Sequence, residues 1–195
     1  DSSFLTHEWS DSQRNFLKDK QFLIIDPALG NRQTIRRFLG YFNVDGNKIH
    51  MMDSFPRAKE VIEEIKPHFI FCEYNLGKFT GLDVLTLHKA AYAERRSLIF
   101  CLMAERNARE ISLKAAQDDV DMFLIKPLSV QILEARYLEV VKLKTENSPY
   151  LEKIEQGKRL WHQKELDQAF NTFEAAKEVN PRLYHAYYYQ AQIKC

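Results

Sequence analysis

The sequence is poor in cysteine, glycine and proline, and it has no long hydrophobic run. Its three cysteines form no CxxC pair, and no Cys/His spacing suits zinc. Cys72 and Cys101 lie inside apolar runs, which indicates buried thiols in a reducing compartment. The longest apolar runs, such as residues 98–104, have seven residues, whereas a membrane-spanning helix needs about 20. These absences exclude a zinc finger and a membrane-spanning segment, and they favour a cytoplasmic location.

An excess of charge of one sign is also missing. Lys plus Arg number 28 and Asp plus Glu number 27, which gives a net charge of +1. Within residues 146–195 there are seven basic and seven acidic residues, so we expect no attraction to nucleic-acid phosphates there. Hydrophobic residues make up 45% of the chain, which excludes a disordered protein and is ordinary for a soluble globular one.

Short apolar runs alternate with amphipathic helical patterns from residue 20 onwards. The predicted strands are residues 22–25, 49–52, 69–72, 98–103 and 122–125. Because most of these runs are apolar on both faces, they predict a parallel sheet covered by helices on both sides. The fold class is therefore α/β, with a five-stranded doubly wound parallel sheet.

Helix-capping residues punctuate the segments between these strands. We predict that Ser54 and Ser129 each cap a helix, and that Thr80 with Asp83 forms a capping box. Asn107 is expected to open another helix. Residues 1–19 are polar with isolated hydrophobic residues, and they predict either a loose arm or a short docking helix.

The last part of the chain has a different pattern, with helices only. Asn147-Ser148-Pro149 marks a boundary, so we place the α/β domain at residues 20–146 and a helical segment at 150–195. The spacing of five residues in that segment resembles the 34-residue tetratricopeptide repeat. They are Gly157, Ala169, Phe173, Ala176 and Pro181. The resemblance implies one full repeat at 150–183 and the first helix of a second.

Leu160 stands where the repeat pattern has an aromatic residue. The predicted framework of the protein-binding repeat is Gly157, Leu160, Ala169 and Phe173. A plain helical hairpin is the alternative.

In doubly wound sheets the working site lies beyond the carboxyl ends of the strands. The residues at those ends are Asp26, Glu73, Met103 and Lys126. With the run from Glu73 to Gly81 and the pair Lys126-Pro127, they make residues 21–145 resemble the receiver domains of response regulators, the CheY-like family. The resemblance implies strand order 2-1-3-4-5 and phosphoryl transfer from a histidine kinase to an aspartate, with Mg²⁺.

The departures from the family pattern concern its chemistry. Glu73 replaces the phosphoacceptor aspartate, Pro27 replaces a second acid, and Met103 replaces the switch hydroxyl. Pro27 supplies no side-chain oxygen for Mg²⁺, and the longer Glu73 shifts its carboxylate. We therefore predict no ordinary phosphorylation, no catalysis, and weak or absent binding of Mg²⁺.

Other pattern residues are retained. Asp26, Asn75 and Lys126 keep the family pattern, and with Glu73 they predict a remnant acidic pocket with a Glu73–Lys126 ion pair. The resemblance places the carbonyl of Asn75 toward a metal. Phe123 occupies the aromatic switch position, although packing in the core explains it equally well.

Three functions follow as hypotheses. The first is a signalling adaptor, a degenerate receiver joined to a tetratricopeptide array. Its expected partners are a histidine kinase, another regulator or a peptide bound by the repeats, with a homodimer through the receiver as a further expectation. The second is a working Mg²⁺-dependent phosphoacceptor that uses Glu73 or another acid. The third is a flavodoxin-like ligand binder, which residues 26–31 disfavour because they hold one glycine and no hydroxyl.

Overall fold

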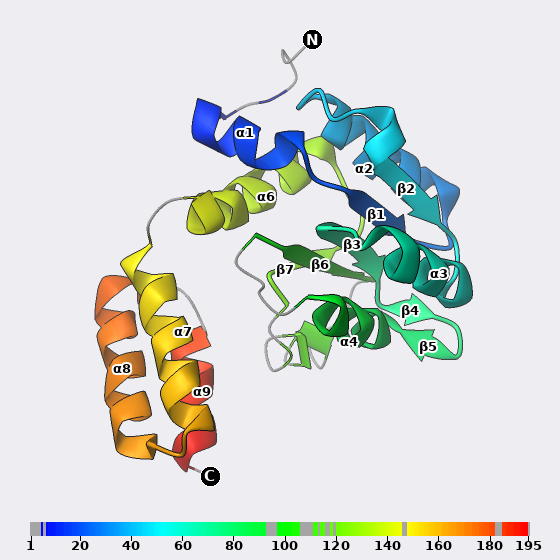
Figure 1. Ribbon diagram of the computed structural model, residues 1–195. Helices are drawn as coiled ribbons and strands as arrows, with labels where there is room; N and C mark the ends of the chain where they lie inside the picture. The colour runs from blue at the N-terminus through cyan, green and yellow to red at the C-terminus, as the bar shows by residue number, and fades with distance from the viewer. Residues whose placement is uncertain are drawn as a thin grey trace. The chain divides into compact units, whose positions relative to one another are not determined.

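The structure is a computed structural model of the 195-residue chain. It describes residues 5, 7–92, 97–105, 111–112, 114–115, 118, 120–145, 148–181 and 185–194. The helix start expected at Asn107, part of the repeat predicted at 150–183, and Cys195 lie outside these residues. The chain forms two compact units, residues 1–145 and 146–195, shown in Figure 1.

The first unit is built on a five-stranded parallel sheet. Its strands are β1 (Phe22–Ile25), β2 (Ile49–Met52), β3 (Phe69–Glu73), β6 (Ile99–Ala104) and β7 (Met122–Ile125). Their order is β2-β1-β3-β6-β7. This is the order 2-1-3-4-5 that the resemblance implied, since β6 and β7 are the fourth and fifth strands of the sheet. All residues of β1, β3 and β6 are buried, as the unbroken apolar runs predicted.

Helices cover both faces of this sheet (Figure 1). The helices of the unit are α1 (Asp11–Lys18), α2 (Leu29–Gly40), α3 (Phe55–Ile65), α4 (Gly81–Ala91) and α6 (Val130–Thr145), with a 3₁₀ turn at Gly46–Lys48. Alternate strand residues divide the interior into two cores. One core packs the sheet against α1, α2 and α6, and the other packs it against α3 and α4.

The caps at the helix starts follow the sequence in two of three places. Asp83 accepts hydrogen bonds from the N–H and hydroxyl of Thr80, at 2.7 and 2.9 Å, and the Ser129 hydroxyl accepts from the N–H of Ile132 at 3.2 Å. Ser54 occupies the N-cap of α3, but its hydroxyl donates to Asp53 and makes no bond to the helix. The predicted cap is therefore correct in place and wrong in bonding.

A short hairpin follows β3, which the sequence did not predict. It pairs β4 (Asn75–Leu76) with β5 (Phe79–Thr80). Gly77 lies in its turn at φ +79°, a conformation that costs glycine little. The hairpin returns the chain to the end of β3, where α4 begins.

Gly81 makes this return tight. A Cβ at Gly81 would lie 2.5 Å from Cδ1 of Leu102 and 2.9 Å from the carbonyl oxygen of Glu73, so no side chain fits. This crowding explains why glycine occupies the position eight residues after Glu73.

The second unit is helical. It contains α7 (Pro149–His162), α8 (Leu166–Val179) and α9 (His185–Lys194). Its core includes Tyr150, Ile154, Ala169, Phe173 and Tyr189. Among the residues that the structure describes, no helix of either unit has the length and apolar character that crossing a bilayer requires.

Candidate functional site

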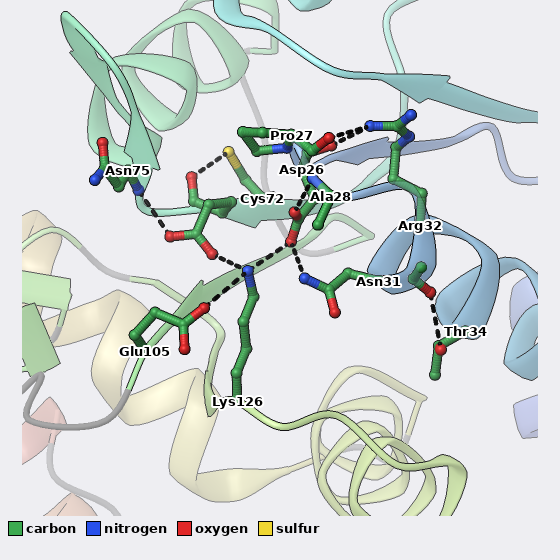
Figure 2. Close-up of polar contacts among 12 residues, drawn as sticks. Asp26, Pro27, Ala28, Asn31, Arg32, Thr34, Cys72, Asn75, Glu105 and Lys126 are labelled. Atoms are coloured by element: carbon green, nitrogen blue, oxygen red, sulfur yellow. Dashed lines mark hydrogen bonds and ion pairs between the residues drawn. The ribbon is translucent and has the colours of Figure 1, made fainter.

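An ion-pair cluster lies at the carboxyl edge of the sheet, shown in Figure 2. The parallel register aligns Ile25 with Cys72 and Glu73 with Met103, so the residues that end β1 and β3 meet at one edge. The ammonium of Lys126 lies 2.7 Å from Oδ2 of Asp26 and also contacts Oε2 of Glu73. The predicted ion pair of Glu73 with Lys126 is therefore present, and Asp26 shares the same cation.

All three charged side chains of this cluster are buried. Asp26, Glu73 and Lys126 are 1%, 5% and 7% exposed. Burial lowers the pKa of Lys126, but the hydrogen bonds and negative charges of Asp26 and Glu73 outweigh it and raise this pKa overall. The lysine is thus held in its charged form by two carboxylates.

The remaining carboxylate oxygens also have donors. Oδ1 of Asp26 accepts from the N–H of Ala28 at 2.8 Å, and Oδ2 accepts from the amide of Asn31 at 3.0 Å. Oε1 of Glu73 accepts from the N–H of Asn75 at 2.9 Å. Each of the four oxygens therefore has a hydrogen-bond donor or the Lys126 cation as a partner.

Asn75 takes part through its N–H, which donates to Glu73, and the placement of its carbonyl toward a metal stays a prediction. Its side chain bonds instead to the N–H of Gly77 at 3.1 Å. The hairpin thus begins with the N–H of Asn75 directed toward the Glu73 carboxylate, as Figure 2 shows.

Three site residues were missed by sequence reasoning. Asn31 and Arg32 lie in the first turns of α2, and Arg32 donates to the carbonyl oxygens of Asp26 and Pro27. Glu105 directly follows β6, and its exposed carboxylate lies 3.7 Å from the Lys126 ammonium. A shallow depression lined by Asn31, Glu105, Lys126 and Pro127 opens beside the cluster. The position of Glu105 immediately after a buried strand was the signal that would have found it.

The two switch positions have different surroundings. Met103 is fully buried in the core that α2 and α6 share with the sheet. Phe123 is only partly buried and packs against the opposite core. Neither side chain offers a hydroxyl to the cluster.

The predicted framework residues of the helical segment hold its helices together. Gly157, Ala169 and Phe173 are buried, and Leu160 is partly buried against the same core. A Cβ at Gly157 would lie 2.5 Å from the ring of Phe173, so α7 and α8 touch where the glycine leaves room. These residues build the unit and leave little surface of their own for a partner.

Comparison with known proteins identifies the fold. A receiver domain of a putative LuxO repressor from Vibrio parahaemolyticus matches with TM-score 0.54 and 17% identity, covering 64% of this chain and 92% of that one. A two-component response regulator from Clostridium difficile matches with TM-score 0.56 and 23% identity, covering 66% and 100%. The chain contains the fold of a response-regulator receiver domain.

Another solved structure matches a larger share of the chain than these two receiver structures do. RcsB from Salmonella enterica serovar Typhimurium, solved on promoter DNA with a phosphomimetic fluoride, matches with TM-score 0.51 and 13% identity, covering 90% of this chain and 98% of that one. No protein-family model matches the sequence, and no curated protein matches it. The receiver fold therefore rests on structure and not on sequence similarity.

Proposed function

We propose that this chain is a two-component signal-transduction protein whose receiver has lost its phosphoacceptor and serves as a protein-binding adaptor. The proposal depends on one observation: the carboxylates of Asp26 and Glu73 already have partners within the chain. Lys126 bridges them, and the remaining donors come from the backbone and Asn31. No catalytic step is assigned to the chain.

Phosphoryl transfer requires an in-line carboxylate with metal and cationic neutralisation of the equatorial oxygens. Glu73 differs from aspartate by one methylene, and its carboxylate is already held by Lys126 and the N–H of Asn75. Each oxygen of this carboxylate already has a partner, so the attacking oxygen would have to give up its contact with Lys126 or with the N–H of Asn75. This arrangement supports a receiver that keeps one state.

The residues at the site do not fit Mg²⁺, which the receiver fold implies. Mg²⁺ needs octahedral oxygen ligands at about 2.0–2.1 Å. Pro27 has no side-chain oxygen, and the Lys126 ammonium lies between the two carboxylates that remain. Within the described part of the chain, no group of three or more His, Cys, Asp or Glu side chains is arranged to hold a metal ion. We therefore assign no step to a metal.

The helical unit supports the adaptor part of the proposal. Two helices of 14 residues, α7 and α8, are joined by a short turn and packed through Gly157 and Phe173. The lengths of these helices and their close contact support the proposal that residues 150–183 form one tetratricopeptide repeat and that α9 begins a second. Such arrays present helical surfaces to proteins or peptides. The balanced charge of residues 146–195 favours a protein over DNA, although the matched RcsB was solved on DNA.

The decisive experiment records amide NMR spectra of the full chain with Mg²⁺ and acetyl phosphate, which is a small phosphodonor. We expect no shifts clustered around Asp26, Glu73 and Lys126 in the wild-type chain. The double variant Pro27→Asp/Glu73→Asp, which restores the two family acids, is the matched control and should show such shifts with Mg²⁺. Clustered shifts in the wild type would establish the alternative, a working phosphoacceptor.

Binding by the receiver is tested with Glu73→Gln, which keeps the side-chain length and removes the charge. Full-length wild type and variant are compared for the proteins they retain in a pull-down. If the ion pair fixes the binding-competent state, the variant loses partners that the wild type retains. Identical sets of partners would contradict the ion-pair lock.

A further inference from the structure

The N-terminal segment is part of the first unit and docks on its helices. We call residues 5 and 7–18 the arm; they end in helix α1, which packs on α6 (Figure 1). A capping box between Ser10 and Gln13 begins this helix, with bonds of 2.9 and 3.3 Å. The docking helix is therefore the alternative that the structure selects for this segment.

A buried carboxylate on α6 anchors the arm. Glu134 is fully buried, and its Oε1 accepts from the N–H of His7 at 2.9 Å and from the indole N–H of Trp9 at 3.3 Å. The ring of His7 lies 3.5 Å from Oε2. Burying a carboxylate is costly unless donors surround it, and the arm supplies these donors. Glu134 is therefore a specific acceptor for an indole and a neighbouring backbone N–H.

Aromatic contacts surround this anchor. The indole of Trp9 is 6% exposed and meets Phe42 edge-on at 4.4 Å and Tyr137 at 6.3 Å between ring centroids. Further along the arm, Leu17 is fully buried, and Phe16 contacts Phe69 of β3 at 5.5 Å. The arm thus presents an indole and then an amphipathic helix of about two turns, whose second turn makes the further apolar contact.

The surface beneath the arm has the composition of a docking site. It combines aromatic rings of α6 and of the turn after α2 with one central acceptor, and an apolar patch of this kind is rarely left open on a soluble protein. A helix of eight residues is too short to be stable alone in water, so α1 owes its structure to this surface. Proteins that bind an amphipathic helix in a groove also bury the apolar face of that helix against a hydrophobic surface.

We call the surface formed by Phe42, Glu134 and Tyr137 the α2–α6 face. We propose that this face binds a short amphipathic helix preceded by tryptophan, and that the arm covers the face until a partner displaces it. The partner is a protein carrying such a helix, with the indole placed one residue before the helix cap as Trp9 is. Its indole N–H bonds to Glu134 and its apolar side chains replace those of the arm. The arm competes with the partner for this face, so a partner binds only if its affinity is high enough to displace the arm.

The test uses a fluorescein-labelled peptide of residues 1–20 as the probe and full-length chains as receptors, with fluorescence anisotropy as the readout. We expect Trp9→Ala to bind the probe at least tenfold more tightly than wild type, because its own arm has lost the indole. Adding Glu134→Ala to this variant should weaken binding at least tenfold. A probe with alanine in place of Trp9 is the matched control and should not bind.

Two outcomes would overturn the proposal. A folded Trp9→Ala chain, as judged by far-UV circular dichroism and by near-UV circular dichroism of its remaining aromatic side chains, that fails to bind the probe shows that the face is no docking site. Equal affinity of wild type and Trp9→Ala shows that the arm does not cover it. Should Trp9→Ala not fold, Ser10→Ala replaces it, because losing the exposed cap weakens α1 without touching the core; we then expect about fivefold tighter binding than to wild type.

Discussion

At the scale of single residues, the charge state of the site is fixed by one lysine. Lys126 is the only cation that contacts both buried carboxylates among the ion pairs of the described residues, and its side chain is 8% exposed. Asn31 and two backbone N–H groups supply neutral donors, which stabilise carboxylates less than a cation does. The stability of the α/β unit should therefore depend strongly on this side chain.

We predict that Lys126→Met destabilises the α/β unit by about 3–5 kcal/mol, because it leaves two buried carboxylates without their counter-ion. Urea unfolding read by Trp9 fluorescence in a Trp161→Phe background measures the change. Lys48→Met is the matched control: its ammonium pairs at 3.3 Å with the exposed Asp19, and its loss should cost under about 1 kcal/mol. Equal effects of the two variants would contradict the account of the site.

The site was predictable where backbone position alone decides it. Asp26, Glu73 and Lys126 end or follow strands of one parallel sheet, so their meeting follows from the fold. Asn31 reaches the same cluster from the first turn of a helix, and its direction depends on how α2 packs. Nothing local in the sequence marks Glu134, since the residues that donate to it lie more than 120 positions away.

At the scale of elements, the close approach of a helix to its neighbour depends on a glycine at two places. Gly81 lets α4 begin against the end of β3, and Gly157 lets α7 lie against the ring of Phe173. Alanine usually stabilises a helix relative to glycine by roughly 1 kcal/mol. At Gly157 the missing space reverses this preference, because Phe173 is itself fully buried and stacked on Tyr189 at 5.0 Å.

Gly157→Ala is accordingly expected to destabilise the helical unit by about 1–3 kcal/mol, the usual cost of overpacking. Thermal or urea unfolding followed by Trp161 fluorescence in a Trp9→Phe background gives the value. A Gly157→Ala/Phe173→Leu double variant should recover part of the loss, because the smaller side chain vacates the space that the methyl group needs. A stabilising Gly157→Ala would show that α7 and α8 lie further apart than described.

Elements with a clear hydrophobic run or a capping motif were predictable from the sequence, and the shortest strands and helices were not. Strand β7 (Met122–Ile125) and the capped start of α4 follow directly from an apolar run and from Thr80 with Asp83. The hairpin of β4 and β5 has two residues in each strand, too few for any alternation to show. Helix α1 carries few hydrophobic residues, and its formation depends on a surface that only the folded domain provides.

At the scale of the whole molecule, the chain contains two units with separate cores and one tryptophan in each. Trp9 is buried in the α/β unit, and Trp161 packs against the core of the helical unit. Each tryptophan therefore reports the unfolding of its own unit, and a change confined to one unit should leave the other signal unaltered.

A pH titration gives the sharpest form of this prediction, through Tyr150. Burial raises the pKa of Tyr150 to about 12, although the N–H of Ala186, which donates to its hydroxyl at 3.3 Å, lowers it in part. Since an unfolded tyrosine ionises near pH 10, the folded helical unit binds the proton more tightly, and its stability falls as the pH rises from about 10 to about 12. The loss should reach about 3 kcal/mol.

Tyr150→Phe removes this titration, so the urea midpoint read by Trp161 should become less dependent on pH above 10, while starting lower at neutral pH because the bond to Ala186 is lost. The midpoint read by Trp9 should be the same in both chains at every pH, although it falls at high pH through Lys126 and Tyr137, whose pKa values are also raised. A change in the Trp9 midpoint on replacing Tyr150 would show that the two units unfold as one, which would contradict the prediction that each tryptophan reports its own unit.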